Sequence, residues 1–139
     1  MENEKRKFTH FKIHTQYSIC EGAIKITDLG KYCKENKIQA IGLSDSFNLC
    51  GALEFSEEIS KSGTQPIIGT QINFIFNNVM GKIPIFAQTK KGFSNLTKLS
   101  SKSYLDAKET LPPHCNLDEL FSHSEDIIVT SGGLDSLLN

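Results

Sequence analysis

The chain has 139 residues, 38% of them hydrophobic, with 15 Lys and Arg against 16 Asp and Glu and a net charge of -1. This composition excludes a disordered tail and a membrane protein, because no apolar run approaches the roughly 20 residues of a membrane-spanning helix. A near-neutral charge also argues against a stand-alone nucleic-acid-binding protein, which is usually basic.

The periodicity of the apolar residues predicts strands and helices that mostly alternate along the chain. The expected strands cover residues 9–14, 38–43, 66–76, 83–88 and 126–130. The expected helices cover residues 27–36, 51–62, 92–105 and 116–121. A loop with two adjacent prolines, Pro112 and Pro113, is expected at 106–115.

Local signals mark several ends of these elements. Either Thr27 or Asp28 can cap the first helix, and Asn116 can cap the last. Gly63 is placed to close the second helix. The Asn77–Asn78 pair together with Gly81 predicts a turn between the third and fourth strands.

The strands at 38–43, 66–70 and 126–130 are apolar on both faces. This pattern is typical of a parallel sheet covered by helices, so the predicted fold class is α/β with mostly parallel strands. Beyond a turn at 131–133, Leu134 and Leu137 look like the first turns of a further helix. We therefore expect the natural folding unit to continue past the end of this sequence.

The four cysteines are Cys20, Cys33, Cys50 and Cys115. No two of them have the Cys-x-x-Cys spacing of a zinc site or a redox motif. The first residues of the chain carry no apolar stretch of the signal-peptide type. We therefore expect reduced thiols and a cytoplasmic protein.

Polar side chains follow the predicted strands at the edge where parallel α/β folds place their functional groups. His14 and Glu21 follow the first strand, Asp45 and Ser46 follow the second, and Gln71 follows the third. A catalytic divalent metal needs at least three good ligands in a fixed arrangement. These residues therefore predict a polar pocket that is a poor metal site.

Simpler interpretations compete with a functional one for several of these residues. His14 at a strand end is more often a satisfied polar residue than a ligand, and Asp45 before a helix is more often an N-cap or a turn acceptor. The 131–133 segment, Ser-Gly-Gly, could cradle a phosphate but lacks the Gly-x-x-x-x-Gly-Lys pattern, which favours a plain turn. We interpret His10 and His114 as surface residues or loop anchors.

Six segments together resemble the opening of the PHP (polymerase and histidinol phosphatase) domain of bacterial DNA polymerase III alpha subunits. They are residues 8–23, 43–51, 54–55, 66–71, 92–102 and 128–133. For example, Leu-Ser-Asp-Ser-Phe-Asn-Leu-Cys-Gly resembles the family's Thr-Asp-His-Gly-Asn-Leu-x-Gly, and Pro-Ile-Ile-Gly-Thr-Gln resembles Pro-Ile-Ile-Gly-x-Glu. The matches occur in the family's order, and together they are highly specific.

The resemblance implies that residues 1–139 are the N-terminal portion of a PHP domain, without the polymerase domains. The implied fold is an incomplete PHP-type distorted (β/α)7 barrel with mostly parallel strands and covering helices. The implied parent protein extends DNA primers, using Mg²⁺ in a polymerase site whose carboxylates lie further along its chain. No cofactor is expected in the segment itself.

Departures from the family pattern bear directly on the implied metal site. Active PHP domains hold metals through a His-x-His pair, an acidic residue in the next loop, a His after Thr-Asp and a Glu after Ile-Gly. The residues at or beside these positions in this chain form a vestigial rim, for which we expect neither a metal nor a catalytic role: Lys12, His14, Glu21, Asp45, Ser46 and Gln71. Lys82 also stands where the family often has a His. Of these, only His14 and Glu21 are plausible ligands.

The leading hypothesis is therefore a non-catalytic structural and docking segment of a replicative polymerase. Its expected partners are other replicase subunits, with a proofreading exonuclease subunit among the candidates, and DNA through the parent protein, with no membrane contact. The alternatives are a metal-dependent phosphoesterase or exonuclease with altered ligands and a free-standing PHP-like binding protein. Open sheet edges near Phe11, Ile13, Ile127 and Val129 also predict self-association.

Overall fold

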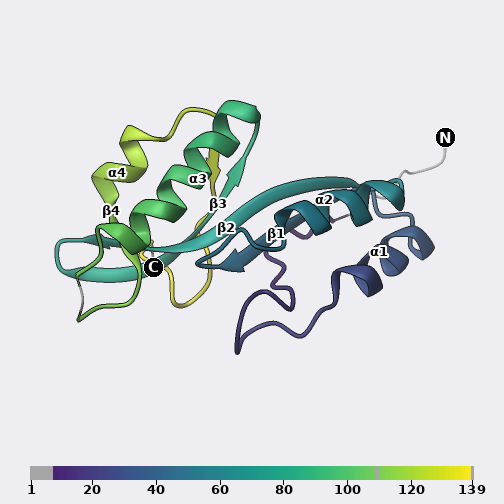
Figure 1. Ribbon diagram of the computed structural model, residues 1–139, viewed down its shortest axis with the longest axis horizontal. Coiled ribbons are helices and arrows are strands. Elements are labelled where there is room, and N and C mark those ends of the chain that lie inside the picture. The colour runs from purple at the N-terminus through teal and green to yellow at the C-terminus, as the bar shows by residue number, and fades with distance from the viewer. Residues whose placement is uncertain (1–7, 109, 139) are drawn as a thin grey trace.

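The computed structural model describes residues 8–108 and 110–138 as a mixed α/β structure (Figure 1). The helices are α1 (Ile26–Glu35), α2 (Ala52–Lys61), α3 (Lys90–Leu105) and α4 (Leu117–Ser122). The strands are β1 (Ala40–Ser46), β2 (Gln65–Phe76), β3 (Val79–Ala87), β4 (His114–Asn116) and β5 (Ile127–Val129). None of the helices in this part of the chain is long and apolar enough to cross a membrane.

The strands form one open sheet in the order β1-β2-β3-β5, with β4 paired to β2. The β1/β2 and β2/β4 pairs are parallel, whereas the β2/β3 and β3/β5 pairs are antiparallel. The prediction of mostly parallel strands is confirmed in part, because β3 alone among these strands runs against the others, and a (β/α)7 barrel is not confirmed. The reversal of β3 follows from the Asn77–Asn78 turn, where both residues have positive φ, 49° and 62°. Such a two-residue turn closes a hairpin, and a hairpin makes its strands antiparallel.

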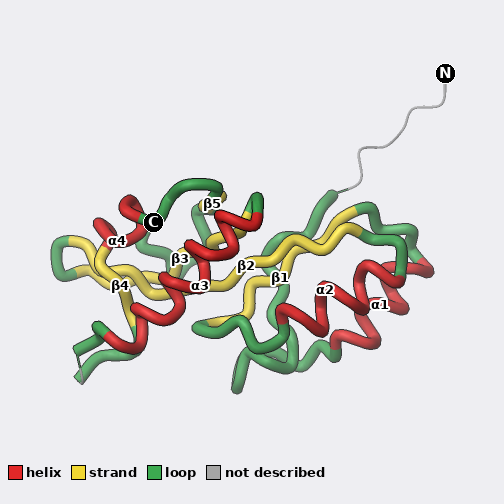
Figure 2. The backbone as a smooth tube through the Cα atoms, turned by 45° about the horizontal axis from the view of Figure 1, so that its top comes forward, coloured by secondary structure: helices red, strands yellow, loops and turns green. Residues whose placement is uncertain are grey.

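The helices cover one face of the sheet in two groups (Figure 2). Near α1 and α2, a core cluster includes Leu43 and Phe55, and near α3 a second cluster includes Phe74, Ile85 and Leu96. All five side chains are fully buried. β2 passes through both halves in Figure 2, and its long apolar run lets one strand contribute to both clusters.

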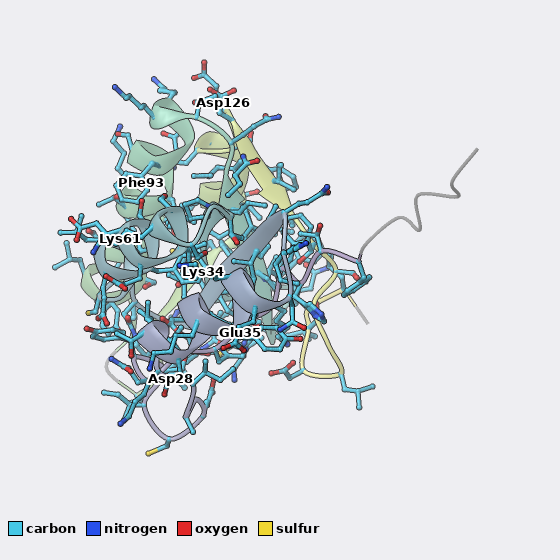
Figure 3. All side chains as sticks on the ribbon, turned by 90° about the vertical axis from the view of Figure 1, so that its right-hand side faces the viewer. Asp28, Lys34, Glu35, Lys61, Phe93 and Asp126 are labelled. Atoms are coloured by element: carbon cyan, nitrogen blue, oxygen red, sulfur yellow. The ribbon has the colours of Figure 1, made fainter. Side chains whose placement is uncertain are left out.

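Side chains alternate along a strand, so the residues between these apolar ones lie on the opposite face. We call this the open face; the register places on it Gly42, Ser44, Ser46, Gly69, Gln71, Asn73, Lys82, Pro84 and Phe86. Figure 3, viewed from the α1/α2 end, shows Asp28, Lys34 and Glu35 of α1 and Lys61 of α2 at the surface. The helix-covered face is thus apolar, whereas the open face mixes small, polar and charged residues.

The expected strand at 9–14 does not form a regular strand. The N–H groups of Gly42 and Ser44 donate to the carbonyls of His10 (2.7 Å) and Ile13 (2.9 Å), so the segment does follow the free edge of β1. However, the Ile13 N–H also donates to the Phe11 carbonyl at 3.2 Å, and this local turn interrupts the strand geometry. The Phe11 ring then packs edge-on against Phe86, 5.4 Å away across the open face.

Other differences from the predicted elements are short and local. The expected loop at 106–115 contains the start of β4, and Gly81, read as part of a turn, lies within β3. Neither Thr27 nor Asp28 caps α1, whose N-cap is Lys25. The Asn116 cap is confirmed as a capping box with Glu119.

The end of the described chain also departs from expectation. Residues 134–138 form turns rather than a helix, and Ser136 bridges to Lys82 of β3. Ile128 and Val129 of β5 are each 42% exposed, so this strand is not apolar on two buried faces. β5 is the last strand in the sheet order, and its Ile128 and Val129 side chains are partly exposed to solvent.

Candidate functional site

The residues expected at the vestigial rim come from β1, β2 and the segment that precedes α1. Ser46 at the end of β1 is directly opposite Gln71 of β2 in the sheet register. Glu21 lies in the loop of residues 16–22, and its carboxylate accepts a 2.5 Å hydrogen bond from the Ser46 hydroxyl. The structure thus brings Glu21 and Ser46 together, as expected for polar groups that follow the carboxyl ends of strands in an α/β sheet.

Asp45 has a different role because strand alternation places it on the helix-covered face. Its carboxylate is fully buried and accepts hydrogen bonds from the Thr15 N–H (2.6 Å), the Thr15 hydroxyl (2.7 Å) and the Ser18 hydroxyl (2.7 Å). Asp45 is therefore neither the N-cap of α2, which is Gly51, nor an acceptor in its own turn, because these donors lie 27 to 30 residues earlier in the chain. Asp45 fixes the path of the loop that carries Glu21. Sequence reasoning missed Thr15 and Ser18, whose hydroxyls gave no signal of this long-range contact.

Lys82 of β3 is the central cation of the rim. Its ammonium donates to a Glu21 carboxylate oxygen at 3.0 Å and lies 3.4 Å from an Asp135 oxygen. The Phe47 ring centroid lies 5.7 Å from the same nitrogen. Burial opposes the charged form, but the bonds and charges of Glu21 and Asp135 outweigh it and raise the pKa of Lys82. Lys82 is therefore an ammonium at neutral pH.

The two carboxylates beside Lys82 are ionised by these contacts. The Ser46 hydrogen bond and the Lys82 ammonium lower the pKa of Glu21, although burial opposes them. At Asp135 burial again opposes ionisation, but a backbone hydrogen bond and the charges of Lys12 and Lys82 lower the pKa overall. Lys12 reaches Asp135 at 4.0 Å. Asp135 was not predicted, because it belongs to a stretch that looked like an apolar helix start.

His14 lies at the margin of this network. Its Nδ1 is 3.3 Å from the Ser18 hydroxyl and 4.0 Å from the nearer Glu21 oxygen. Burial lowers the pKa of His14 and outweighs the opposing effect of Glu21, while Lys12 and Lys82 lower it further. The imidazole is therefore neutral at pH 7.

Gln71 contributes an unusual buried amide. The side chain is 1% exposed, and its Oε1 has no hydrogen-bond partner among the described residues. Its neighbour across the β2/β3 pair is Pro84, which has no N–H to donate. Its neighbour in β1, Ser46, donates to Glu21 instead.

These donors do not fit the metal cluster that the resemblance implies. Lys12 presents an ammonium and Gln71 a neutral amide, where a hard or borderline cation needs imidazole or carboxylate ligands. Both oxygens of Glu21 already accept hydrogen bonds, one from Ser46 and one from the Lys82 ammonium. Within residues 8–108 and 110–138, no group of three or more His, Cys, Asp or Glu side chains could hold a metal ion. The rim's positive charge is supplied by lysines.

The comparisons with known proteins agree with the resemblance drawn from the sequence. The PHP domain family matches residues 10–139. The DNA polymerase III subunit alpha of Caulobacter vibrioides is 39% identical over 140 residues, which cover 95% of this chain and 12% of that protein. For the same subunit of Helicobacter pylori the identity is 35% over 145 residues, covering 98% of this chain and 12% of that protein. The chain thus spans about an eighth of the length of these relatives.

A solved structure shares the fold at a lower level of similarity. It is that of a candidate metal-dependent phosphoesterase from Bifidobacterium adolescentis, with a TM-score of 0.54 and 15% sequence identity. The match covers 68% of this chain and 32% of that one. At this identity the likeness establishes the fold alone.

Proposed function

The chain belongs to the PHP domain family, and from that premise we propose that it is the N-terminal PHP segment of a DNA polymerase III alpha subunit, acting as a non-catalytic structural and docking module. Residues 1–139 are then the first part of a PHP domain, and the polymerase domains belong to the remainder of the longer protein. The similarity to alpha subunits over nearly the whole chain supports this assignment.

The observation that carries the non-catalytic role is the position of Lys82. Its ammonium contacts Glu21 and Asp135, so the carboxylates that could attract a metal are already neutralised within the protein. Metal-assisted phosphoester hydrolysis needs an open coordination position that holds and activates a water molecule. We infer that neither a metal nor a catalytic residue resides at the rim of Lys12, His14, Glu21, Asp45, Ser46 and Gln71.

The parent protein's chemistry is proposed from the relatives. A primer 3′-hydroxyl attacks the α-phosphate of a deoxynucleotide, and Mg²⁺ held elsewhere in the parent stabilises the displacement. The proposed partners of the segment are other replicase subunits in the cytoplasm, with a proofreading exonuclease subunit among the candidates. DNA is reached only through the parent.

Self-association of this chain is part of the same proposal. Phe11 and Val129 are 37% and 42% exposed at the margins of an open sheet, and Ile13 and Ile127 are half-buried beside them. Exposed apolar edges favour association. Sedimentation equilibrium at micromolar concentration should give a dimer or larger species, and a clean 15.5 kDa monomer would reject this part of the proposal.

The alternative is a metal-dependent phosphoesterase or exonuclease, favoured by the fold shared with the Bifidobacterium adolescentis protein. An assay of the purified chain separates the two functions. With Mn²⁺, Zn²⁺ or Mg²⁺, we expect no hydrolysis of bis(p-nitrophenyl) phosphate or single-stranded DNA above a metal-only blank, and no primer extension. The same preparation should bind a purified replicase subunit in calorimetry. Metal-dependent turnover that a chelator abolishes would establish the alternative.

A further inference from the structure

Lys82 joins three parts of the chain that are distant in sequence. It is anchored in β3, opposite Asn73 of β2, and its side chain contacts Glu21 in loop 16–22 and Asp135 in segment 131–138. We propose that Lys82 is an electrostatic clasp, which holds loop 16–22 over the open face and segment 131–138 along the adjoining edge of β3, and which loosens both segments together when its ion pairs break. This inference rests on contacts within the chain and not on the proposed function.

The anchor of the clasp is rigid, whereas the two segments that it holds are irregular. β3 is paired along its length with β2, including the Asn73–Lys82 position. Loop 16–22 and segment 131–138 consist of turns and bends, and Asp135 is 51% exposed at its side chain. Segment 131–138 is also joined to β3 through the backbone, because the Lys82 N–H donates to the Asp135 carbonyl at 2.9 Å and Ser136 forms a bridge with Lys82. Irregular segments with few such bonds open more readily than paired strands. A charge fixed on β3 can therefore hold both segments without itself moving.

One buried polar atom destabilises the closed state. Gln71 lies beneath the rim with its Oε1 buried and without a partner among the described residues, and an unsatisfied buried acceptor destabilises the conformation that buries it. Opening the rim lets water reach this oxygen. The ion pairs of Lys82 favour the closed state and the hydration of Gln71 favours the open one, so the two contributions oppose each other.

Lys12 and Lys102 provide matched comparisons for Lys82. Among the described residues, Lys12 pairs with a single carboxylate, that of Asp135, at 4.0 Å. Lys102 of α3 also pairs with two carboxylates, those of Asp106 and Glu119, each at 3.2 Å, but it lies on the helix-covered side. Lys102 shows the effect of removing a doubly paired charge away from the rim, and Lys12 shows the effect of removing a singly paired charge at the rim. Comparison with both isolates the effect of removing Lys82.

Hydrogen–deuterium exchange of the full chain tests the clasp. In Lys82→Met, which keeps an unbranched stem but removes the charge, amides of loop 16–22 and of segment 131–138 should exchange about three to five times faster. Lys12→Met should affect only segment 131–138, and to a smaller extent, while Lys102→Met should change neither. Lys82→Arg should restore protection, because a guanidinium can reach both carboxylates.

A measurement on the unmodified chain keeps the test decisive if the Lys82→Met variant does not fold. Raising NaCl to about 1 M shortens the screening length to about 3 Å and should speed exchange in the same two segments selectively. The clasp is overturned if Lys82→Met leaves both segments as protected as Lys102→Met does. It is also overturned if faster exchange spreads equally to α1, or if high salt leaves both segments unchanged.

Discussion

The two faces of the sheet are held by different kinds of interaction. On the helix-covered face, large side chains such as Phe55, Phe74 and Leu96 are fully buried, and the removal of apolar surface from water stabilises the fold. On the open face, Gln71 and Lys82 lie under irregular segments that are tied down by ion pairs and single hydrogen bonds. The helix-covered face is therefore held by apolar burial, whereas polar contacts hold much of the cover over the open face.

Small residues make the close cover of the open face possible. A Cβ atom on Gly42 would lie 2.6 Å from the Phe11 carbonyl oxygen, and one on Gly69 would lie 2.3 Å from the Phe86 ring. Gly42 therefore lets the segment before α1 approach β1, and Gly69 leaves room for the Phe86 ring against which Phe11 packs. This face excludes water by close backbone approach together with that aromatic pair.

The largest effect should come from the helix-covered face. Phe55→Ala removes a fully buried ring from the cluster between α1, α2 and β1, and should lower the free energy of unfolding by about 3–5 kcal/mol. Phe11→Ala, at a 37% exposed ring of the open face, should cost about 1 kcal/mol. Urea denaturation of the two variants measures the difference. Equal losses would contradict the contrast between the faces.

The next effect concerns the carboxylate beneath the rim. Asp45→Ala leaves the Thr15 N–H and the Thr15 and Ser18 hydroxyls without their acceptor, and should cost roughly 2–3 kcal/mol in urea denaturation. Asp28→Ala is the control, because that carboxylate is exposed on α1 and, within the described part of the chain, forms its ion pair with Lys31. If Asp45→Ala is as mild as the control, Asp45 does not organise the loop.

Acid should weaken the open face first. The pKa values of Glu21, Asp135 and His14 are all lowered in the folded chain, so each group binds its proton more readily after unfolding. The resulting stability is present above the unfolded pKa values and lost as pH falls through the folded ones. Because Glu21 and Asp135 are partly exposed, each contributes less than about 1 kcal/mol.

Unfolding in urea at several pH values between about 7 and 3 measures this loss. Glu21→Gln should flatten the decline below about pH 4.5, the ordinary value for Glu, because the substituted side chain no longer titrates. His14→Gln should flatten the part that begins near pH 6.5. A stability that rises as the pH falls would contradict the assigned directions.

The smallest effect is expected on Zn²⁺ affinity when the family's metal ligands are restored at the rim. Lys12→His, Ser46→His and Gln71→Glu together should raise Zn²⁺ affinity in calorimetry, but only modestly while Lys82 keeps its ammonium beside Glu21. Adding Lys82→His should raise the affinity further. If the triple variant already binds as tightly as the quadruple one, Lys82 does not compete with a cation.

Much of the helix-covered face could be predicted from the sequence, because α1, α2 and α3 have apolar periodicity over ten or more residues. The sheet was harder to predict. The Asn77–Asn78 turn was recognised, but its consequence for strand direction was not, and the three residues of β4 are too few to show a period. Leu134 and Leu137 have the spacing of a helix, and this spacing does not reveal that the segment around Ser136 forms a bridge with Lys82 of β3.

The sequence predicted the rim residues that lie at strand ends, but it did not predict those that are brought in by ion pairs or hydrogen bonds with distant parts of the chain. The register of Ser46 and Gln71 follows from two neighbouring parallel strands. Asp45 lies on the helix-covered face because β1 continues to Ser46, whereas the sequence predicted that the strand ends at residue 43. Asp135 gave no signal, because its partner Lys82 belongs to a distant strand.

The metal content of the purified chain tests the central claim most directly, that lysine ammonium groups rather than a metal ion neutralise the rim. Elemental analysis after dialysis against metal-free buffer should find Zn, Mn and Fe far below one atom per chain. The melting temperature should not change when EDTA is added, because a metal bound only to the folded state would contribute to stability and be lost. About one or more metal atoms per chain, together with a melting temperature that falls on chelation, would contradict the account.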